Sequence, residues 1–248
     1  MKREKITKRK SLIVLITTLF VASTNAQDNQ LWLDNFTMWT FSQRWEYELN
    51  IGGNYLLIEN GWKDYYINNT LTHEYRWWCP SEASLELHYT NDPQEINSTE
   101  QRISLAQKMI FTKFMNVIHL EKPYIYGKYD YRVISYIDDY QTDIKQRVRL
   151  KVGGRFILNN TVVEAHSIYA PVAYEKFFNI NDAAIEHFAA KDKFMVGLGY
   201  AFTNKLRSEF VYYLYRSKNT VENSYATTDV VYQLLLRYYI YEVNYNFK

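Results

Sequence analysis

Apolar and polar side chains alternate at every second position in several runs of this chain. The clearest runs cover residues 45–51, 84–89, 147–152, 193–202, 209–214 and 239–247. Successive side chains of a β-strand point to opposite faces, so this period indicates strands with one apolar, aromatic face and one charged face. The pattern therefore predicts an all-β protein.

Extending the pattern along the chain gives eleven strand-like segments. They cover residues 29–40, 45–54, 64–78, 83–91, 100–111, 114–125, 141–158, 162–175, 192–202, 206–216 and 230–247. Several reach ~10 residues, which is the length that a tilted strand needs to cross a bilayer. Strands in soluble globular sheets are usually nearer ~5–6 residues. Strand length therefore favours an antiparallel transmembrane β-barrel over a soluble, tyrosine-rich β-sandwich.

The predicted connections alternate in length. Short turns are expected at residues 42–43, 80–81, 112–113, 159–160 and 203–205, and longer loops around 55–63, 92–99, 126–140, 176–191 and 217–229. Short periplasmic turns and longer extracellular loops are typical of outer-membrane barrels. This contrast is the second argument for a membrane barrel.

An even strand number is expected, because bacterial single-chain barrels have even numbers of strands. Ten spanning strands result if residues 27–44 form a plug in the lumen. Twelve result if residues 27–44 contain the first strand and one more strand is hidden in residues 114–136. The sequence thus predicts 10 to 12 strands.

The first 26 residues have the three parts of a secretory signal peptide. Basic residues are concentrated in residues 2–10, an apolar run extends from Leu12 to Ala22, and small residues stand at Thr24 and Ala26. The run is shorter than the about 20 apolar residues of a transmembrane helix, although an uncleaved membrane anchor is the alternative. Cleavage after Ala26 is expected, which leaves residues 27–248 as a single exported barrel domain.

Removing the signal peptide reverses the sign of the net charge. Residues 1–26 contain six of the 29 basic residues and one of the 27 acidic residues, so the formal net charge changes from +2 to −3. A nucleic-acid partner requires a basic face, and the exported part does not supply one. Its single cysteine, Cys79, also excludes an intramolecular disulfide.

Composition agrees with a membrane barrel. Aromatic residues make up 17% of the chain, and 24 of them are tyrosines, yet the mean hydropathy is negative. Such a balance fits strands with one aromatic face and one polar face, with aromatic girdles at the two bilayer surfaces. Outer-membrane lipid is therefore an expected partner.

The charged face of the strands is expected to line the lumen. A barrel of this size is mostly filled by side chains, so charges of opposite sign should pair there. The predicted lumen charge ladder consists of Glu46, Glu48, Glu74, Arg76, Glu86, His88, Arg102, Arg147, Arg149, Glu175, Lys193 and Glu209. Its mixed signs predict a self-neutralised interior or a very narrow path.

Motifs for catalysis, metals and cofactors were sought, and none is expected. The chain has no Gly-rich phosphate loop, no paired-cysteine metal site and no Gly-x-Ser-x-Gly sequence. Its five histidines are scattered, without the spacing that zinc enzymes use. His88, beside Glu86 on the polar face, is the best candidate for a catalytic residue, and a hydrogen-bonded lumen residue is the favoured interpretation.

The C-terminal segment ends in alternating aromatic residues. Tyr239, Tyr241, Val243, Tyr245 and Phe247 form its apolar face, one residue before the end at Lys248. This run resembles the closing strand that outer-membrane barrels present to the barrel-assembly machinery. That machinery is therefore an expected partner, through the strand that ends at Phe247.

Five segments resemble the bacterial outer-membrane β-barrel family called domain of unknown function 2490, and the resemblance extends over nearly all of residues 27–248. They are the opening Trp32 with the run Trp45-Glu46-Tyr47-Glu48-Leu49, then Glu100-Gln101-Arg102-Ile103, Arg147-Val148-Arg149-Leu150, Tyr174-Glu175-Lys176-Phe177-Phe178-Asn179 and Lys193-Phe194-Met195-Val196-Gly197-Leu198-Gly199-Tyr200. Two positions depart from the family pattern, Lys193 in place of Arg and Lys122-Pro123 in a usually more basic stretch. The resemblance implies a barrel in the outer membrane of Gram-negative bacteria and no particular activity.

Three functional hypotheses follow. The first is a non-enzymatic barrel that acts as a narrow channel, a binding platform or a structural component. The second is a barrel enzyme that acts on lipid, with His88 as its candidate residue. The third is a soluble secreted β-sandwich protein. The sequence favours the first, because no catalytic set of residues is visible.

Overall fold

The computed structural model describes residues 28–93, 96–111, 120–137, 141–180, 191–219 and 224–241. In these ranges the chain forms eleven β-strands, and no helix there is long and apolar enough to cross a membrane. The strands are β1 (Asp28–Thr40), β2 (Trp45–Leu56), β3 (Lys63–His73), β4 (Ser81–Asn91), β5 (Ser98–Ile110), β6 (Leu120–Tyr136), β7 (Thr142–Ile157), β8 (Ile168–Asn179), β9 (Lys191–Ala201), β10 (Leu206–Asn219) and β11 (Ser224–Tyr241). The predicted all-β fold is confirmed. The proposed signal peptide lies outside the described residues.

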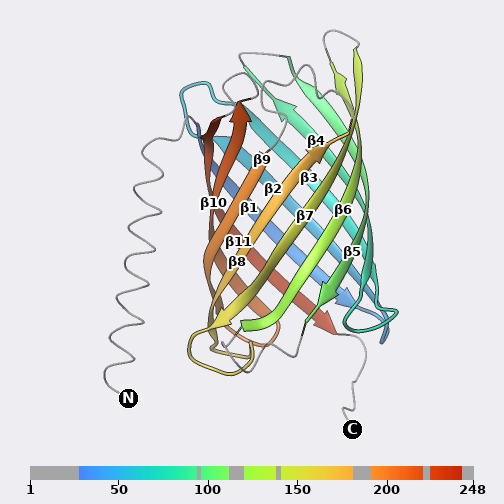
Figure 1. The fold of residues 1–248 in the computed structure, drawn as a ribbon, viewed down its shortest axis with the longest axis vertical. Helices are drawn as coiled ribbons and strands as arrows, with labels where there is room; N and C mark the ends of the chain where they lie inside the picture. The colour runs from blue at the N-terminus through green and yellow to red at the C-terminus, as the bar shows by residue number, and fades with distance from the viewer. Residues whose placement is uncertain are drawn as a thin grey trace.

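One sheet closes on itself to form a barrel (Figure 1). Each strand pairs antiparallel with the next strand along the chain, and β1 pairs with β11 in parallel. All the strands of the described residues belong to this single sheet, so the two-sheet sandwich is not the fold. Closure gives every strand two neighbours, which leaves no open edge.

The odd strand number determines how the barrel closes. When direction alternates over eleven strands, the first and the last run the same way, so their seam is parallel. Its register places Asp28 opposite Asp229 and Thr40 opposite Tyr241. Asp28 and Tyr241 therefore lie at opposite ends of the barrel (Figure 1).

The range of 10 to 12 strands is confirmed, but the even number was wrong. Residues 28–40 pair on both sides, with β2 and β11, and so form a wall strand rather than a plug. Residues 120–136 form one strand, β6, where a strand at 114–125 and a loop at 126–140 had been expected. An even number of strands is required only when every neighbouring pair is antiparallel. The parallel pairing of β1 with β11 allows an odd number.

The strand bounds do not reproduce the expected contrast in loop length. Of the connections that the structure describes in full, 41–44, 74–80, 158–167 and 202–205 lie at the lower end in Figure 1, and 57–62 lies at the upper end. The lower set was expected to be short. Instead, the 17 residues of β6 and the 16 of β7 remain paired and extend above their neighbours at the upper end.

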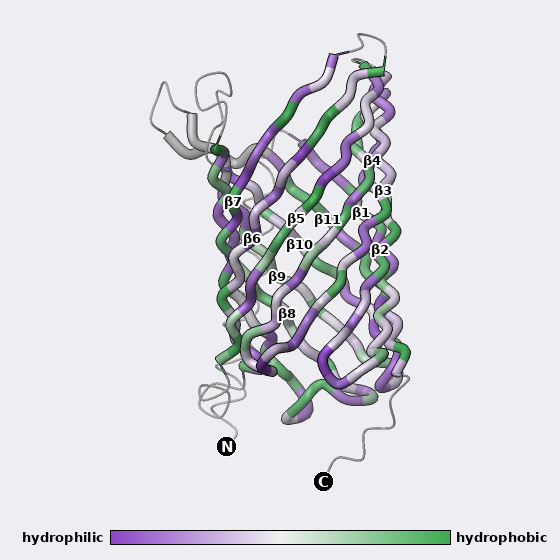
Figure 2. Tube along the Cα trace, turned by 90° about the vertical axis from the view of Figure 1, so that its right-hand side faces the viewer, coloured by the Kyte–Doolittle hydropathy of each residue, from purple (hydrophilic) through white to green (hydrophobic). Residues whose placement is uncertain are grey.

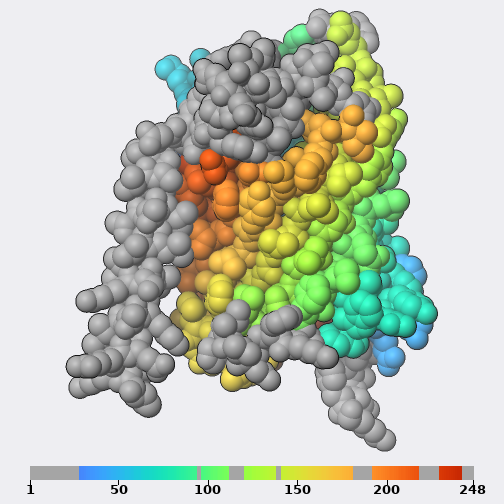
Figure 3. Space-filling view, viewed as in Figure 1, coloured from blue at the N-terminus to red at the C-terminus, as the bar shows by residue number. Residues whose placement is uncertain are grey.

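Alternate side chains point outward and into the lumen along each strand. On β5, Ile103 and Leu105 are 57% and 62% exposed, whereas Ser104 between them is 1% exposed. Apolar and polar residues accordingly alternate along the strands in Figure 2. Every strand has at least one large exposed apolar or aromatic side chain, and Figure 3 shows side chains of β6 to β10 packed side by side over the outer wall.

The last strand departs from the expected orientation. Tyr239 and Tyr241 line the lower part of the lumen, although their alternating run had been assigned to the lipid-facing side. Pairing with β10 decides this, because Arg237 lies opposite Arg207 and both point inward. The rest of the run, including Phe247, lies outside the described residues.

Candidate functional site in the barrel lumen

Two cavities occupy the lumen, one toward each end of the barrel. The upper cavity has a volume of about 650 Å³ and the lower cavity about 690 Å³, and no residue lines both. A layer of buried side chains that line neither cavity lies between them. We call this layer the septum; it consists of Asp34, Asn50, Ser104, Asp130, Glu175 and Val231.

Asp34 is the centre of one half of the septum. Its side chain, 6% exposed, accepts hydrogen bonds from Asn50 Nδ2 at 3.2 Å, from the Tyr66 hydroxyl and from the Gln233 amide. The Tyr213 hydroxyl donates in turn to Gln233. These contacts join β1 to β2, β3 and β11, so one carboxylate ties together the strands around the parallel seam.

Asp130 is the centre of the other half. It is fully buried and accepts hydrogen bonds from Ser104 Oγ at 2.8 Å and from Arg147 Nε at 3.0 Å. Arg149 Nε lies 2.9 Å from the same carboxylate, and Arg149 Nη1 lies 3.6 Å from Glu175. A buried carboxylate is tolerated when cations or hydrogen-bond donors compensate it, and Asp34 and Asp130 both meet this condition.

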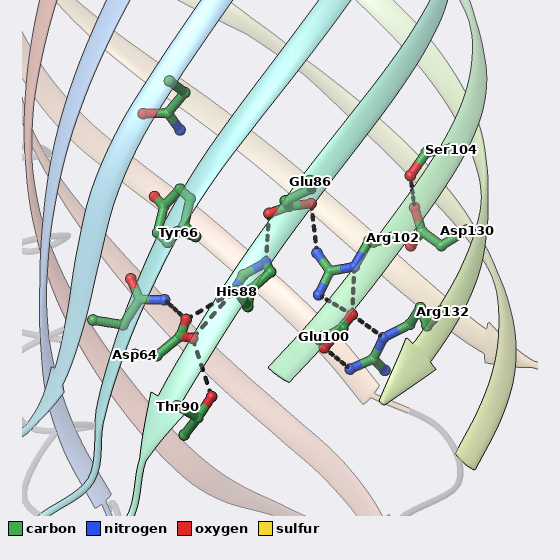
Figure 4. A network of polar contacts seen from close by, with 12 residues as sticks. Asp64, Tyr66, Glu86, His88, Thr90, Glu100, Arg102, Ser104, Asp130 and Arg132 are labelled. Atoms are coloured by element: carbon green, nitrogen blue, oxygen red, sulfur yellow. Dashed lines mark hydrogen bonds and ion pairs between the residues drawn. The ribbon is translucent and has the colours of Figure 1, made fainter. Parts of the chain in front are cut away.

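A histidine lies between two carboxylates in the wall of the upper cavity (Figure 4). His88 Nδ1 is 2.9 Å from Asp64 Oδ2, and His88 Nε2 is 3.0 Å from Glu86 Oε1. Asp64 also accepts a hydrogen bond from Thr90 Oγ1 at 3.1 Å. Both ring nitrogens therefore face acceptors, and the acids hold the ring in place.

The same chain of contacts continues across β5 to β6 (Figure 4). Arg102 donates to Glu86 at 2.8 Å and lies 2.8 Å from Glu100. Arg132 then binds both oxygens of Glu100, at 2.7 Å and 2.8 Å. Acids and bases thus alternate along this chain of contacts, and each meets an opposite charge directly.

Lys193 lies where the upper cavity meets the septum. Its ammonium group is 4.2 Å from the ring centre of Tyr213, 5.3 Å from that of Tyr215 and 5.4 Å from that of Trp32. Glu175 lies 3.8 Å away. Cation–π contacts of this kind stabilise a desolvated ammonium group, so Lys193 is compensated by rings and by one carboxylate.

Charges in the lower cavity are grouped by strand, with the exceptions of Glu121 on β6 and Glu209 on β10. The acids Glu46, Glu48 and Glu82 come from β2 and β4, and Glu74 follows β3. Bases line much of the rest of the wall: Lys108, Lys128, Lys151, Arg155, Arg207 and Arg237, from β5, β6, β7, β10 and β11. The structure therefore has two different arrangements of charge in one lumen.

The predicted charge ladder is distributed over both cavities. Glu86, His88, Arg102, Arg147, Arg149 and Lys193 line the upper cavity, Glu175 belongs to the septum, and Glu46, Glu48, Glu74 and Glu209 line the lower cavity. Arg76 is the exception: it is exposed in the connection 74–80, beside the rings of Tyr75 and Trp78. The prediction extended the strand to residue 78, whereas β3 ends at His73.

Several lumen residues were missed by the sequence analysis. Glu100 and Lys108 have the same parity as Arg102 on one predicted strand, so the alternation could have identified them. Asp130 and Arg132 could not be found in this way, because residues 126–140 were assigned to a loop. Asp34 was missed because residues 27–44 were considered as a plug.

The described residues contain no group of His, Cys, Asp and Glu side chains that could hold a metal ion. Fold and site together define a closed β-barrel with a polar lumen divided by a septum. No protein-family model matches the chain, and no curated protein matches it.

Proposed function

We propose that this chain is an outer-membrane β-barrel protein of Gram-negative bacteria whose divided lumen has a binding or structural role rather than that of a permanently open pore. Residues 1–26 would direct export and be removed. The resemblance to the outer-membrane family supports the same location. Lipid around the barrel and the barrel-assembly machinery, acting on the C-terminal segment up to Phe247, would be its partners.

The apolar outer face is the observation that supports this location. Each strand exposes large apolar side chains on the outside, whereas the charged side chains of the described strands are concentrated in the lumen. Hydrocarbon provides no hydrogen-bond partners, and a closed barrel satisfies its backbone groups internally. Water would be a poor solvent for an outer wall of this kind.

The septum is the reason to prefer binding over free conduction. Asp34 and Asp130 each join neighbouring strands through hydrogen bonds of side chains buried in the lumen between the two cavities. A solute passing from one cavity to the other would have to move past these buried side chains. Each cavity is therefore suited to holding a solute, whereas passage requires rearrangement.

Membrane fractionation tests the proposal. The protein is expected to stay with outer-membrane fragments after a carbonate wash, and to migrate faster on a gel before heating than after it, because folded barrels resist denaturation by detergent. A compact monomer that dissolves in buffer without detergent would contradict the membrane location and support the soluble alternative.

An enzyme acting on lipid is the second candidate, through His88. Because His88 lies inside the lumen between Asp64 and Glu86, its substrate would have to enter the upper cavity rather than approach from the outer wall. Replacing His88 by Ala and comparing lipid composition with that of the wild type tests this candidate. Identical lipid profiles would remove His88 from consideration.

A further inference from the structure

The two cavities treat charge differently although they share one lumen. In the upper cavity, Glu86 and Glu100 each contact an arginine within 3 Å. In the lower cavity, Glu46, Glu48 and Glu82 have no ion pair within 4.0 Å among the described residues. If the charges of the lumen only had to neutralise each other, the acids of both cavities could be paired with bases in the same way.

Acidic and basic side chains form neighbouring parts of the wall of the lower cavity. Glu46 and Glu48 on β2 and Glu82 on β4 form an acidic wall, in which the lumen-facing neighbours on β3 are Asn68, Thr70 and Thr72. We define the basic wall as Lys108, Lys128, Lys151 and Arg155, from β5 to β7, a stretch in which Glu121 is the one acid of the described residues that also lines the cavity. An acidic wall beside a mainly basic wall, in a low-dielectric surround, creates an electric field in the cavity that runs from one wall toward the other.

The lower cavity also contains buried polar atoms without a hydrogen bond among the described residues. Glu121 is 9% exposed, and its Oε2 has no donor; the nearest cation, Arg155 Nη1, is 3.9 Å away. Nε of Arg207 likewise has no acceptor, and Nε of Arg237 has only Glu209 Oε1, at 3.4 Å. Buried polar groups are normally satisfied, so these atoms mark positions where a ligand can supply the partner.

We propose that the lower cavity binds a dissolved zwitterion, a molecule with an ammonium group at one end and a carboxylate or phosphate group at the other. The ammonium group contacts the acidic wall, and the anionic group contacts the basic wall. This inference rests on the proposed binding role of the divided lumen and names the class of ligand for one cavity.

Size and access agree with a small solute. The volume of about 690 Å³ falls within the about 300–1,000 Å³ of typical small-molecule sites. The rings of Phe36, Tyr124 and Tyr126 line the same space and provide apolar contacts for the body of the ligand. The closed wall separates the cavity from lipid, so the ligand comes from solution through the lower end.

Four forms of one tripeptide test the proposal: trialanine, N-acetyl-trialanine, trialanine amide and N-acetyl-trialanine amide. The first has both charges, the next two have one each, and the last has none. Titration calorimetry on the purified protein folded in detergent is expected to give the tightest binding for trialanine. Each singly charged form should bind at least about tenfold more weakly, because one charged wall then lacks its partner.

Two variants test which charged wall binds which end of the peptide. Glu48→Gln should abolish the preference for trialanine over N-acetyl-trialanine, and Lys151→Met should abolish the preference over trialanine amide. Glu164→Gln and Lys205→Met are matched controls, since both residues are exposed in connections at the same end but line neither cavity. The controls should leave every affinity unchanged.

Equal binding of all four forms, or no binding of any, would overturn the inference. The binding of the four peptide forms to the wild-type protein decides the inference by itself. This result does not depend on whether a variant folds. The heat-dependent gel shift reports the folding of each variant separately. A protein that fractionates with the outer membrane but does not distinguish the peptides keeps the proposed location and loses the zwitterion site.

Discussion

Arg102 has a carboxylate on each side, Glu86 at 2.8 Å and Glu100 at 2.8 Å, and all three side chains are only 12–13% exposed. Desolvation makes each of these charges costly alone, so their stability depends on mutual contact. The side chain of Arg76 is exposed, so the charge of Arg76 is expected to contribute little to stability.

Replacing Arg102 by Met is therefore expected to reduce the free energy of unfolding by about 3–5 kcal/mol, because two buried carboxylates lose their shared cation. Urea titration of the folded barrel in detergent, followed by tryptophan fluorescence, measures this change. Arg76→Met is the matched control and should leave the midpoint nearly unchanged. Equal effects of the two substitutions would contradict the importance of the buried network.

Gly199 is required by the fully buried ring of Tyr169, whose hydroxyl donates to Glu209 at 2.9 Å. A Cβ atom at residue 199 would lie 2.4 Å from that ring. We expect Gly199→Ala to reduce the free energy of unfolding by about 1–3 kcal/mol through overpacking. Gly127→Ala, whose Cβ would meet only Leu150 at 3.7 Å, should cause no loss in the same titration. A larger loss at Gly127 would argue against this packing.

At the scale of the element, β6 shows how a strand can continue through an irregular position. The register shifts between Glu121 and Tyr124, where Lys122 has a positive φ of 47° and Pro123 has no N–H to donate. A bulge accommodates both residues and re-aims the strand. Below it Glu121 faces the lower cavity, and above it Lys128, Asp130 and Arg132 face the lumen.

The β1–β11 seam is the element that closes the barrel, and its register can be tested by a disulfide. Leu33 and Leu234 are paired in parallel and both point outward, at a separation suited to a disulfide. In a Cys79→Ala background, Leu33→Cys with Leu234→Cys should form a cross-link that speeds migration of the heat-denatured chain without reductant. Leu33→Cys with Tyr238→Cys should not, because Tyr238 pairs with Thr37. Cross-linking of the second pair alone would show a different seam.

At the scale of the whole molecule, the septum lies between the two cavities of the lumen. Asp34 accepts hydrogen bonds from β2, β3 and β11, so its removal loosens the layer where most contacts converge. The wild-type protein in planar bilayers is expected to show no steady open level. Asp34→Ala combined with Gln233→Ala should produce measurable conductance, since the carboxylate and its buried partner are both lost.

The control for this experiment is Asn35→Ala, at the next position of the same strand but on the outer face. It should behave as the wild type does. A steadily conducting wild-type protein would contradict a closed septum and favour the narrow-channel hypothesis. An unchanged double variant would show that other side chains close the lumen.

Much of the fold could be predicted because the strand period is local. Alternation in residues 147–152 and 193–202 assigned Arg147, Arg149 and Lys193 to the polar face without knowledge of any partner strand. The alternation failed for Arg76, because β3 ends before this residue, and for Asp130, because β6 continues through a stretch that had been assigned to a loop. A strand ends where pairing stops, and pairing depends on the neighbouring strand rather than on the segment alone.

The chain by itself determined an all-β fold with about the right number of strands, and it determined which side chains share a face. Only the tertiary structure decided the parallel seam, the inward orientation of Tyr239 and Tyr241, and the sorting of charges into two cavities. Side-chain alternation is a property of a few consecutive residues, so the sequence displays it directly. Closure joins residues about two hundred positions apart, and the contacts of Asp34 with Gln233 exist only after those distant strands have met.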